Sequence, residues 1–130
     1  GQQALLFIAL CRLRGIPARW QSGWMLFPGA TGMHDWAWFH VEPYGWLPAD
    51  LTEGSYPGDD PLVRDFGFGH LDAYRFVAND DYGQTLCPPK QHLRSETVDF
   101  QRGEVEWRGG NLYFGQWRAR LKATDLGNVE

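Results

Sequence analysis

Apolar and polar positions follow two different periods along the chain, and the change of period separates its elements. Residues 1–14 contain an apolar run over 4–11 that is filled mostly with good helix formers. Gly15 and Pro17 end this run, so the pattern predicts a helix over 1–14. Apolar residues surround the middle of this helix, which predicts that it is buried on most sides.

From residue 18 onward an aromatic-rich pattern with a period of two is typical of strands. Strands are predicted over 18–26, 34–42, 46–50 and 73–78, and a C-terminal hairpin is predicted over 98–107 and 112–121. Glycine and proline mark a loop over 27–32, a turn over 43–45 and a mostly irregular connection over 51–70. The elements together predict an α+β fold, in which one buried helix packs against an antiparallel sheet.

Composition restricts the classes of protein that this chain can represent. Its 130 residues suit one domain, with the sequence motifs in 1–52 and C-terminal strands and loops in 53–130. Sixteen Gly, eight Pro and seven Trp indicate a loop-rich globular domain with an aromatic core. The formal net charge of −4 argues against a nucleic-acid partner, and no apolar run is long enough to be a transmembrane segment.

Two polar residues lie at the ends of the predicted 34–42 and 46–50 hairpin. His34 begins one strand and Asp50 ends the other, so antiparallel pairing brings both side chains to the same end of the sheet. A carboxylate bonded to one imidazole nitrogen fixes the tautomer and leaves the other nitrogen to act as a base. Spacing alone favours the simpler interpretation, a surface histidine and a strand-ending aspartate.

Three sequence blocks give this pair more weight: residues 10–19 (LCRLRGIPAR), 34–36 (HDW) and 45–52 (GWLPADLT). In this order and at these spacings they resemble the transglutaminase-like superfamily, the papain-related cysteine acyltransferases and peptidases. The resemblance implies a papain-like core, with His34 as general base and acid and Asp50 as the group that orients its ring. It implies a nucleophilic cysteine at the start of the first helix, immediately before Gly1. We therefore expect a truncated domain that begins just after this cysteine and is inactive as given.

The other candidate ligands and nucleophiles fit a site less well. Cys11 lies about three turns into the predicted helix and Cys87 lies in a loop, so neither suits a nucleophile. His34 and His40 share a strand face, but a third clear ligand for zinc is missing. We expect no metal and no cofactor. Two tryptophans beside the pair are the candidates for a substrate groove: Trp24 and Trp36.

In the intact parent, the resemblance implies a bacterial cysteine hydrolase that cleaves amide or peptide bonds by acyl transfer. The expected partner is a peptide or protein substrate, with glutamine-like and cell-wall-peptide-like chemistry as candidates, in an exported or periplasmic protein. Two alternatives stay open within the family: a crosslinking transglutaminase and a non-catalytic binding or scaffolding module. A carbohydrate-binding β-domain is a third reading. It predicts several coplanar, solvent-facing tryptophans, whereas the enzyme predicts that most are buried.

Overall fold

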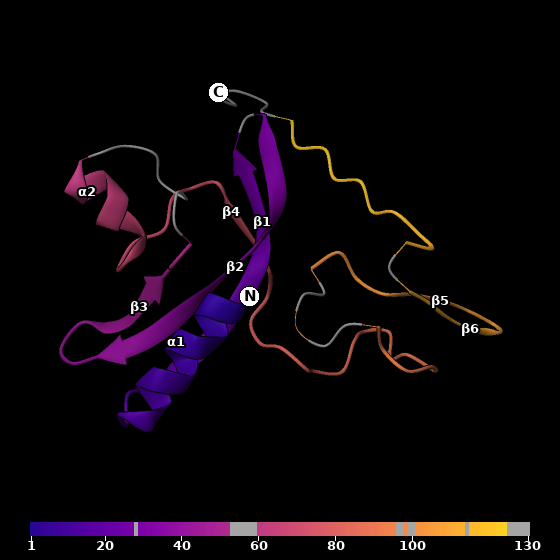
Figure 1. Ribbon diagram of the computed structural model, residues 1–130, viewed down its shortest axis with the longest axis horizontal. Helices are drawn as coiled ribbons and strands as arrows, with labels where there is room; N and C mark the ends of the chain where they lie inside the picture. Colours follow the sequence, from indigo (N-terminus) through magenta and orange to yellow (C-terminus); the bar gives the residue numbers. More distant parts are fainter. Residues whose placement is uncertain (28, 53–59, 96–97, 99–100, 114, 125–130) are drawn as a thin grey trace.

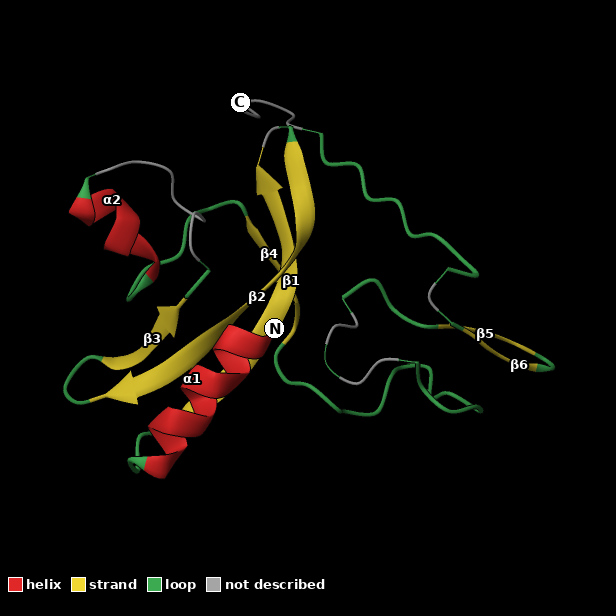
Figure 2. Ribbon diagram, in the orientation of Figure 1, coloured by secondary structure: helices red, strands yellow, loops and turns green. Residues whose placement is uncertain are grey.

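The computed structural model describes residues 1–27, 29–52, 60–95, 98, 101–113 and 115–124 (Figure 1). Within these residues, one long helix lies along a four-stranded antiparallel sheet, and a small hairpin lies apart from that sheet (Figure 2). The predicted α+β fold, one helix against an antiparallel sheet, is confirmed. No described helix is long and apolar enough to cross a membrane.

The helix α1 (Gln2–Leu13) packs on the sheet along one side only. Its buried residues recur at helical spacing: Ala4, Ile8 and Cys11. Three leucines on its other side are 61%, 53% and 80% exposed: Leu6, Leu10 and Leu13. The prediction of burial on most sides is therefore wrong for the described residues, because the sheet covers a single stripe of the helix and leaves the remaining apolar positions open.

The end of α1 sets the direction in which the chain enters the sheet. Gly15 adopts φ +74°, a left-handed conformation that glycine accepts without strain, and this ends the helix where the sequence predicts. The Ile16 N–H then donates to the Cys11 carbonyl over 2.9 Å. Arg12 donates from Nε and Nη2 to the Ala18 carbonyl, which fixes the start of the first strand against the helix.

The main sheet has the strand order β3-β2-β1-β4, and every neighbouring pair is antiparallel. Its strands are β1 (Ala18–Phe27), β2 (Ala30–Val41), β3 (Gly45–Ala49) and β4 (Arg75–Asn79). All four predicted strands are present, but β1 and β2 extend into the predicted loop over 27–32 and pair up to Phe27 and Ala30. Gly29, at φ +79°, allows the chain to reverse within this short distance.

The two faces of the sheet have different neighbours. On one face, Trp20 stands opposite Ala37, which stands opposite Ala49, and all three are buried in the core that contains α1. Tyr82 places its ring edge against Trp20 at 6.0 Å between centroids. Because side chains alternate along a strand, His34 and the other residues on its side of β2 face away from α1.

The connection from β3 to β4 carries two short helical turns, α2 (Pro61–Arg64) and a 3₁₀ turn (Asp65–Gly67), in the region predicted to be mostly irregular. The Asp60 carboxylate caps α2 by accepting from the Leu62 N–H over 2.9 Å. Phe68 then forms a bridge with Ala49, so this connection returns to the end of β3.

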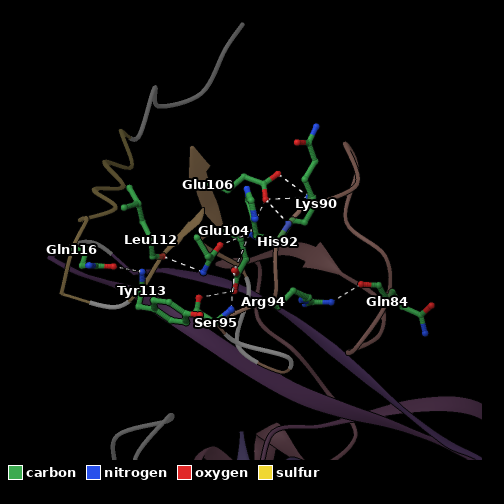
Figure 3. Close-up of polar contacts among 12 residues, drawn as sticks. Gln84, Lys90, His92, Arg94, Ser95, Glu104, Glu106, Leu112, Tyr113 and Gln116 are labelled. Carbon is green, nitrogen blue, oxygen red and sulfur yellow. Dashed lines mark hydrogen bonds and ion pairs between the residues drawn. The ribbon is translucent and has the colours of Figure 1, made fainter. Parts of the chain in front are cut away.

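The C-terminal segment, defined here as the described residues of 83–124, contains the short hairpin β5 (Val105–Trp107) and β6 (Gly110–Leu112). The hairpin lies where the sequence predicts, but the predicted strand lengths, 98–107 and 112–121, are wrong for the described residues. Polar contacts surround this hairpin, as Figure 3 shows. Glu106 accepts from the N–H groups of Gln91 and His92, and the Tyr113 N–H donates to Gln116.

Candidate active site

The end of β3 brings His34 and Asp50 together on the sheet face opposite α1. Pairing of β2 with β3 stops at Ala37 and Ala49, and Asp50 is the next residue. His34 Nε2 lies 2.7 Å from Asp50 Oδ2, as the hairpin geometry predicts. The Asp50 side chain is fully buried and that of His34 is 12% exposed. The contact is part of the structure, whereas the catalytic roles of the two residues stay a prediction.

A third side chain, from outside the predicted pair, binds the same carboxylate. Arg75, the first residue of β4, places Nη2 2.9 Å from Asp50 Oδ2, and its side chain is 2% exposed. Sequence reasoning placed Arg75 on a strand but gave it no role. Its spacing from Asp50 held no signal, because a long connection with its own helical turns separates them.

Backbone contacts hold Asp50 from both sides. Its N–H donates to the Gly67 carbonyl over 2.8 Å, and its Oδ1 accepts from the Thr52 N–H over 3.1 Å. Burial alone would raise the pKa of Asp50, but the hydrogen bond and charge of His34, the Thr52 N–H and the Arg75 charge together lower it. The ionised carboxylate accepts hydrogen bonds only, so His34 Nε2 is the donor and Nδ1 is the nitrogen that can exchange a proton.

Trp36 contacts the His34 side chain from the same strand. It is completely buried, and its ring stacks with the His34 ring at 6.3 Å between centroids. The Arg75 guanidinium lies over the same indole, 6.0 Å from its centroid. One aromatic ring therefore contacts both partners of Asp50 and restricts where each can lie.

Gln21 is a second residue that sequence reasoning missed. It stands opposite Trp36 on β1, and its Oε1 accepts from the indole N–H groups of Trp36 and Trp38, each over 2.7 Å. Its Nε2 donates to Asp80 over 2.6 Å. The period-two pattern of β1 does place Gln21 on the His34 face, but a buried amide that links two indoles depends on neighbouring strands.

The two groove candidates lie on different faces of the sheet. Trp36 shares the His34 face, whereas Trp24 stands opposite Met33 on the α1 face and donates to the Gln101 carbonyl over 3.3 Å. The assignment of Trp24 and Trp36 to a substrate groove stays a prediction. The carbohydrate-binding alternative requires several coplanar, solvent-facing tryptophans. Trp46 is 40% exposed and Trp107 is 56% exposed, but the two lie on separate sheets.

The start of α1 contacts β2 at the residue next to His34. The Gly1 nitrogen is 2.9 Å from the carboxylate of Asp35, the residue that follows His34. Because β3 no longer pairs with β2 at this level, the β2 edge beside His34 is not covered by a β3 strand partner. Cys11 lies further along α1, where burial raises the pKa of its thiol, and Cys87 lies in an exposed loop.

The described residues contain no group of three His, Cys, Asp or Glu side chains arranged to hold a metal. His40 has Glu42 at 3.9 Å and the Trp46 ring at 5.5 Å as neighbours, and His70 stacks on Phe66. The arrangement that the structure does offer is a histidine oriented by a buried, ionised carboxylate. Such an imidazole can remove a proton from a nucleophile and return it to a leaving group.

Comparison with known proteins gives one match. Residues 1–51 match the family model of the transglutaminase-like superfamily, which covers part of a domain and includes both His34 and Asp50. No curated protein and no solved structure matches the chain. The match agrees with the resemblance carried by the three sequence blocks, and with the papain-like α+β fold that the resemblance implies.

Proposed function

Because residues 1–51 match the transglutaminase-like superfamily as a partial domain, we propose that this chain carries the acid–base half of a cysteine-dependent acyl-transfer site. His34 is the general base and acid in this proposal, and Asp50 orients its ring. The observation that supports it most is the 2.7 Å contact between His34 Nε2 and a fully buried Asp50 carboxylate.

The reaction would begin with transfer of the thiol proton to His34 Nδ1, which produces a thiolate beside an imidazolium. The thiolate attacks an amide carbonyl, and His34 returns the proton to the nitrogen as the C–N bond breaks. A thioester and a free amine result. Water, deprotonated by His34, then attacks the thioester, which yields a carboxylic acid and restores the thiol. Asp50 stabilises the imidazolium at both stages.

The start of α1 is the point from which a thiol would reach His34. Gly1 contacts Asp35, the neighbour of His34, and backbone N–H groups at a helix start favour a thiolate. Cys11 does not suit this role, because it is buried in the core and its thiol pKa is raised. The nucleophile in this proposal is the cysteine that the resemblance to the transglutaminase-like superfamily implies immediately before Gly1.

We propose hydrolysis of a peptide or protein amide as the reaction, with lysine-dependent crosslinking as the alternative outcome of the same thioester. A non-catalytic module is the other alternative. The buried, charge-balanced His34–Asp50 pair favours catalysis, because a module that only binds has no need to keep an ionised carboxylate beside an imidazole.

The test places a short leader ending in cysteine before Gly1 and measures alkylation of that thiol by iodoacetamide at pH 6, in a Cys87→Ser background. Thiolate formation assisted by His34 should make alkylation about tenfold or more faster than in the same chain with His34→Gln. A leader ending in serine measures the contribution of Cys11. Equal rates with and without the His34→Gln substitution would contradict the proposal.

Turnover then separates the chemical alternatives. A mixture of peptide amides is incubated with the cysteine-extended chain, with and without an added primary amine, and the products are identified by mass spectrometry. Free acid in both reactions indicates a hydrolase, and a secondary amide formed with the amine indicates a crosslinking enzyme. By analogy with serine-protease triads, Asp50→Asn should lower the rate by as much as about 10⁴-fold. Full activity in Asp50→Asn would refute the assignment of Asp50.

A further inference from the structure

Asp50 Oδ2 is shared by two groups that come from different strands. His34 Nε2 reaches it from β2 at 2.7 Å, and Arg75 Nη2 reaches it from β4 at 2.9 Å. The other oxygen, Oδ1, accepts from the Thr52 N–H. Both oxygens of the carboxylate are therefore held, and one of them is bound to a permanent positive charge.

We infer, on the basis of the proposed function, that Arg75 is a positioning residue of this active site: it fixes the Asp50 carboxylate and balances its charge, so that the His34–Asp50 pair releases its shared proton at a lower pH than the pair would alone. Arg75 lies outside residues 1–51, the part of the chain that matches the family model. The site is thus completed by β4, from the C-terminal side of the chain.

The surroundings of Arg75 hold it on Asp50 and keep it from a substrate. Its side chain is 2% exposed, and its Nε lies 3.2 Å from Asp72 Oδ2. The rings of Trp36 and Phe27 lie 6.0 and 5.9 Å from its guanidinium carbon. A guanidinium enclosed in this way is held away from solvent while it binds Asp50, so it acts as a positioning residue.

Gly23 explains how β4 comes close enough to deliver Arg75. A Cβ at this position would lie 1.8 Å from the Phe76 carbonyl oxygen, so any other residue would push β4 away. The pairing of β1 with β4 shifts register beside Gly23, and His34 is the β2 partner of the same glycine. Close approach of β4 and placement of Arg75 next to the pair therefore have one local cause.

The effect on proton release follows from the charges around Asp50. A buried carboxylate beside an imidazole stabilises the imidazolium, which makes a poor base. Arg75 offsets that negative charge, and Asp72 partly offsets Arg75 in turn. Among the other described carboxylates, Asp35 is on the other face of β2 and contacts the Gly1 nitrogen, and Asp80 accepts from Gln21. Removing the Arg75 charge should let the pair keep its proton to higher pH.

The experiment follows the His34 ring by ¹⁵N NMR of the 130-residue chain labelled at histidine, so it needs no catalytic activity. His34→Gln identifies the His34 signals among the four histidines. In Arg75→Gln the pH at which the pair releases its proton should rise by about one unit or more. Arg19→Gln is the matched control, because Arg19 lies on the same sheet face but contacts Trp46, and it should leave the titration unchanged.

Two further variants test the charge of Arg75 even if Arg75→Gln fails to fold or changes the orientation of Asp50. Arg75→Lys keeps the charge, so its titration should stay close to that of the unmodified chain. Asp72→Asn removes the carboxylate that opposes Arg75 and should move proton release to lower pH. An unchanged titration in a folded Arg75→Gln chain would overturn the inference, as would a rise in Asp72→Asn.

The same variants in the cysteine-extended chain separate this inference from the proposed function. The pH dependence of alkylation should shift in Arg75→Gln in the same direction as the NMR titration. If the NMR titration shifts but no thiol reacts faster than its His34→Gln control, Arg75 tunes the pair and the proposed catalysis is wrong. If thiols react as expected but neither measurement moves in Arg75→Gln, the catalytic proposal stands and the role of Arg75 is wrong.

Discussion

The helix–sheet core, formed by α1 and β1–β4, and the C-terminal segment are held together in different ways. The core buries apolar side chains between α1 and the sheet, with Trp20 at 1% exposure and Ala37 fully buried. The C-terminal segment is organised by side chains that bind backbone N–H groups, as at Glu104 and Glu106 (Figure 3). Burial of apolar surface stabilises the first region, and satisfied polar groups determine the second.

The proposed active site lies in the core, the region that buries its side chains, and this includes Arg75 from β4. A buried carboxylate needs rigid, water-excluding surroundings to orient a histidine, and the sheet face around Trp36 provides them. Contacts from the C-terminal segment reach the core at Val98, which packs against the buried cluster, and at Gln101. Gln101 donates to the His34 carbonyl over 3.4 Å and accepts from Trp24 through its own carbonyl.

The largest effect that we expect comes from Trp20→Ala. Trp20 is almost completely buried between α1 and the sheet, so its removal leaves a cavity that costs about 3–5 kcal/mol of unfolding free energy. Urea unfolding followed by tryptophan fluorescence and circular dichroism measures this loss. Trp107→Ala, at a residue that is 56% exposed on β5, is the matched control and should cost less than about 1 kcal/mol. Similar losses in both variants would contradict the contrast between the regions.

The same contrast decides how much of the molecule could be predicted from sequence. The helix and β1–β3 follow from local information, because glycine and proline end each element and period-two patterns fix which residues share a face. The pairing of the 34–42 and 46–50 segments brings His34 and Asp50 to the same end of the sheet, and the three sequence blocks gave this pair its weight. Side chains that act through a neighbour distant in sequence could not be found in this way.

Arg75 and Gln21 are the clearest examples of what sequence left out. The first meets Asp50 only because β4 joins the far edge of the sheet beside Gly23, and no local pattern specifies that edge. The second depends on two indole N–H groups from β2. The short β5 and β6 have a related cause, because Glu106 binds the backbone of 91–92, a non-local interaction that strand patterning does not register.

We expect the two regions to lose stability at different pH values as the solution is acidified. In the folded chain the pKa of Asp50 lies below its ordinary value of 3.8, with burial opposed chiefly by His34. The pKa of Glu106 lies below its ordinary value of 4.5, chiefly because of the Gln91 N–H. Each carboxyl binds a proton in the unfolded state first, so each stabilises the fold above its ordinary value and loses this effect as pH falls through its lowered pKa.

The ordinary value of Glu106 is the higher one, so the contribution of the C-terminal segment should begin to fall at a higher pH than that of Asp50. Hydrogen exchange at pH 5, 4 and 3 should therefore show loss of protection at 105–112 before loss in β1 and β2. Glu106→Gln should make the protection of 105–112 less dependent on pH, and Asp50→Asn should do so for the core. Simultaneous loss in both regions would show that they unfold as one unit.

The smallest effect on the core should come from Lys90→Met. Lys90 Nζ donates to the Asn111 side-chain oxygen and lies 3.5 Å from both Glu104 and Glu106. The substitution removes the positive charge near Glu104 and Glu106 and the hydrogen-bond donor to the Asn111 oxygen. We therefore expect local opening of this segment to become more favourable by about 1–3 kcal/mol. Lys122→Met is the matched control, since Lys122 is exposed and is the only other lysine of the chain.

Hydrogen exchange resolves the result residue by residue. Protection should fall at 105–112 and at 91–95 in Lys90→Met, while the amides of β1 and β2 keep the protection they have in Lys122→Met. The His34 ring titration should also stay unchanged, because Lys90 contacts no residue of the site described around Asp50. A drop in core protection, or a displaced His34 titration, would mean that the polar contacts around Lys90 also support the core and the His34–Asp50 pair.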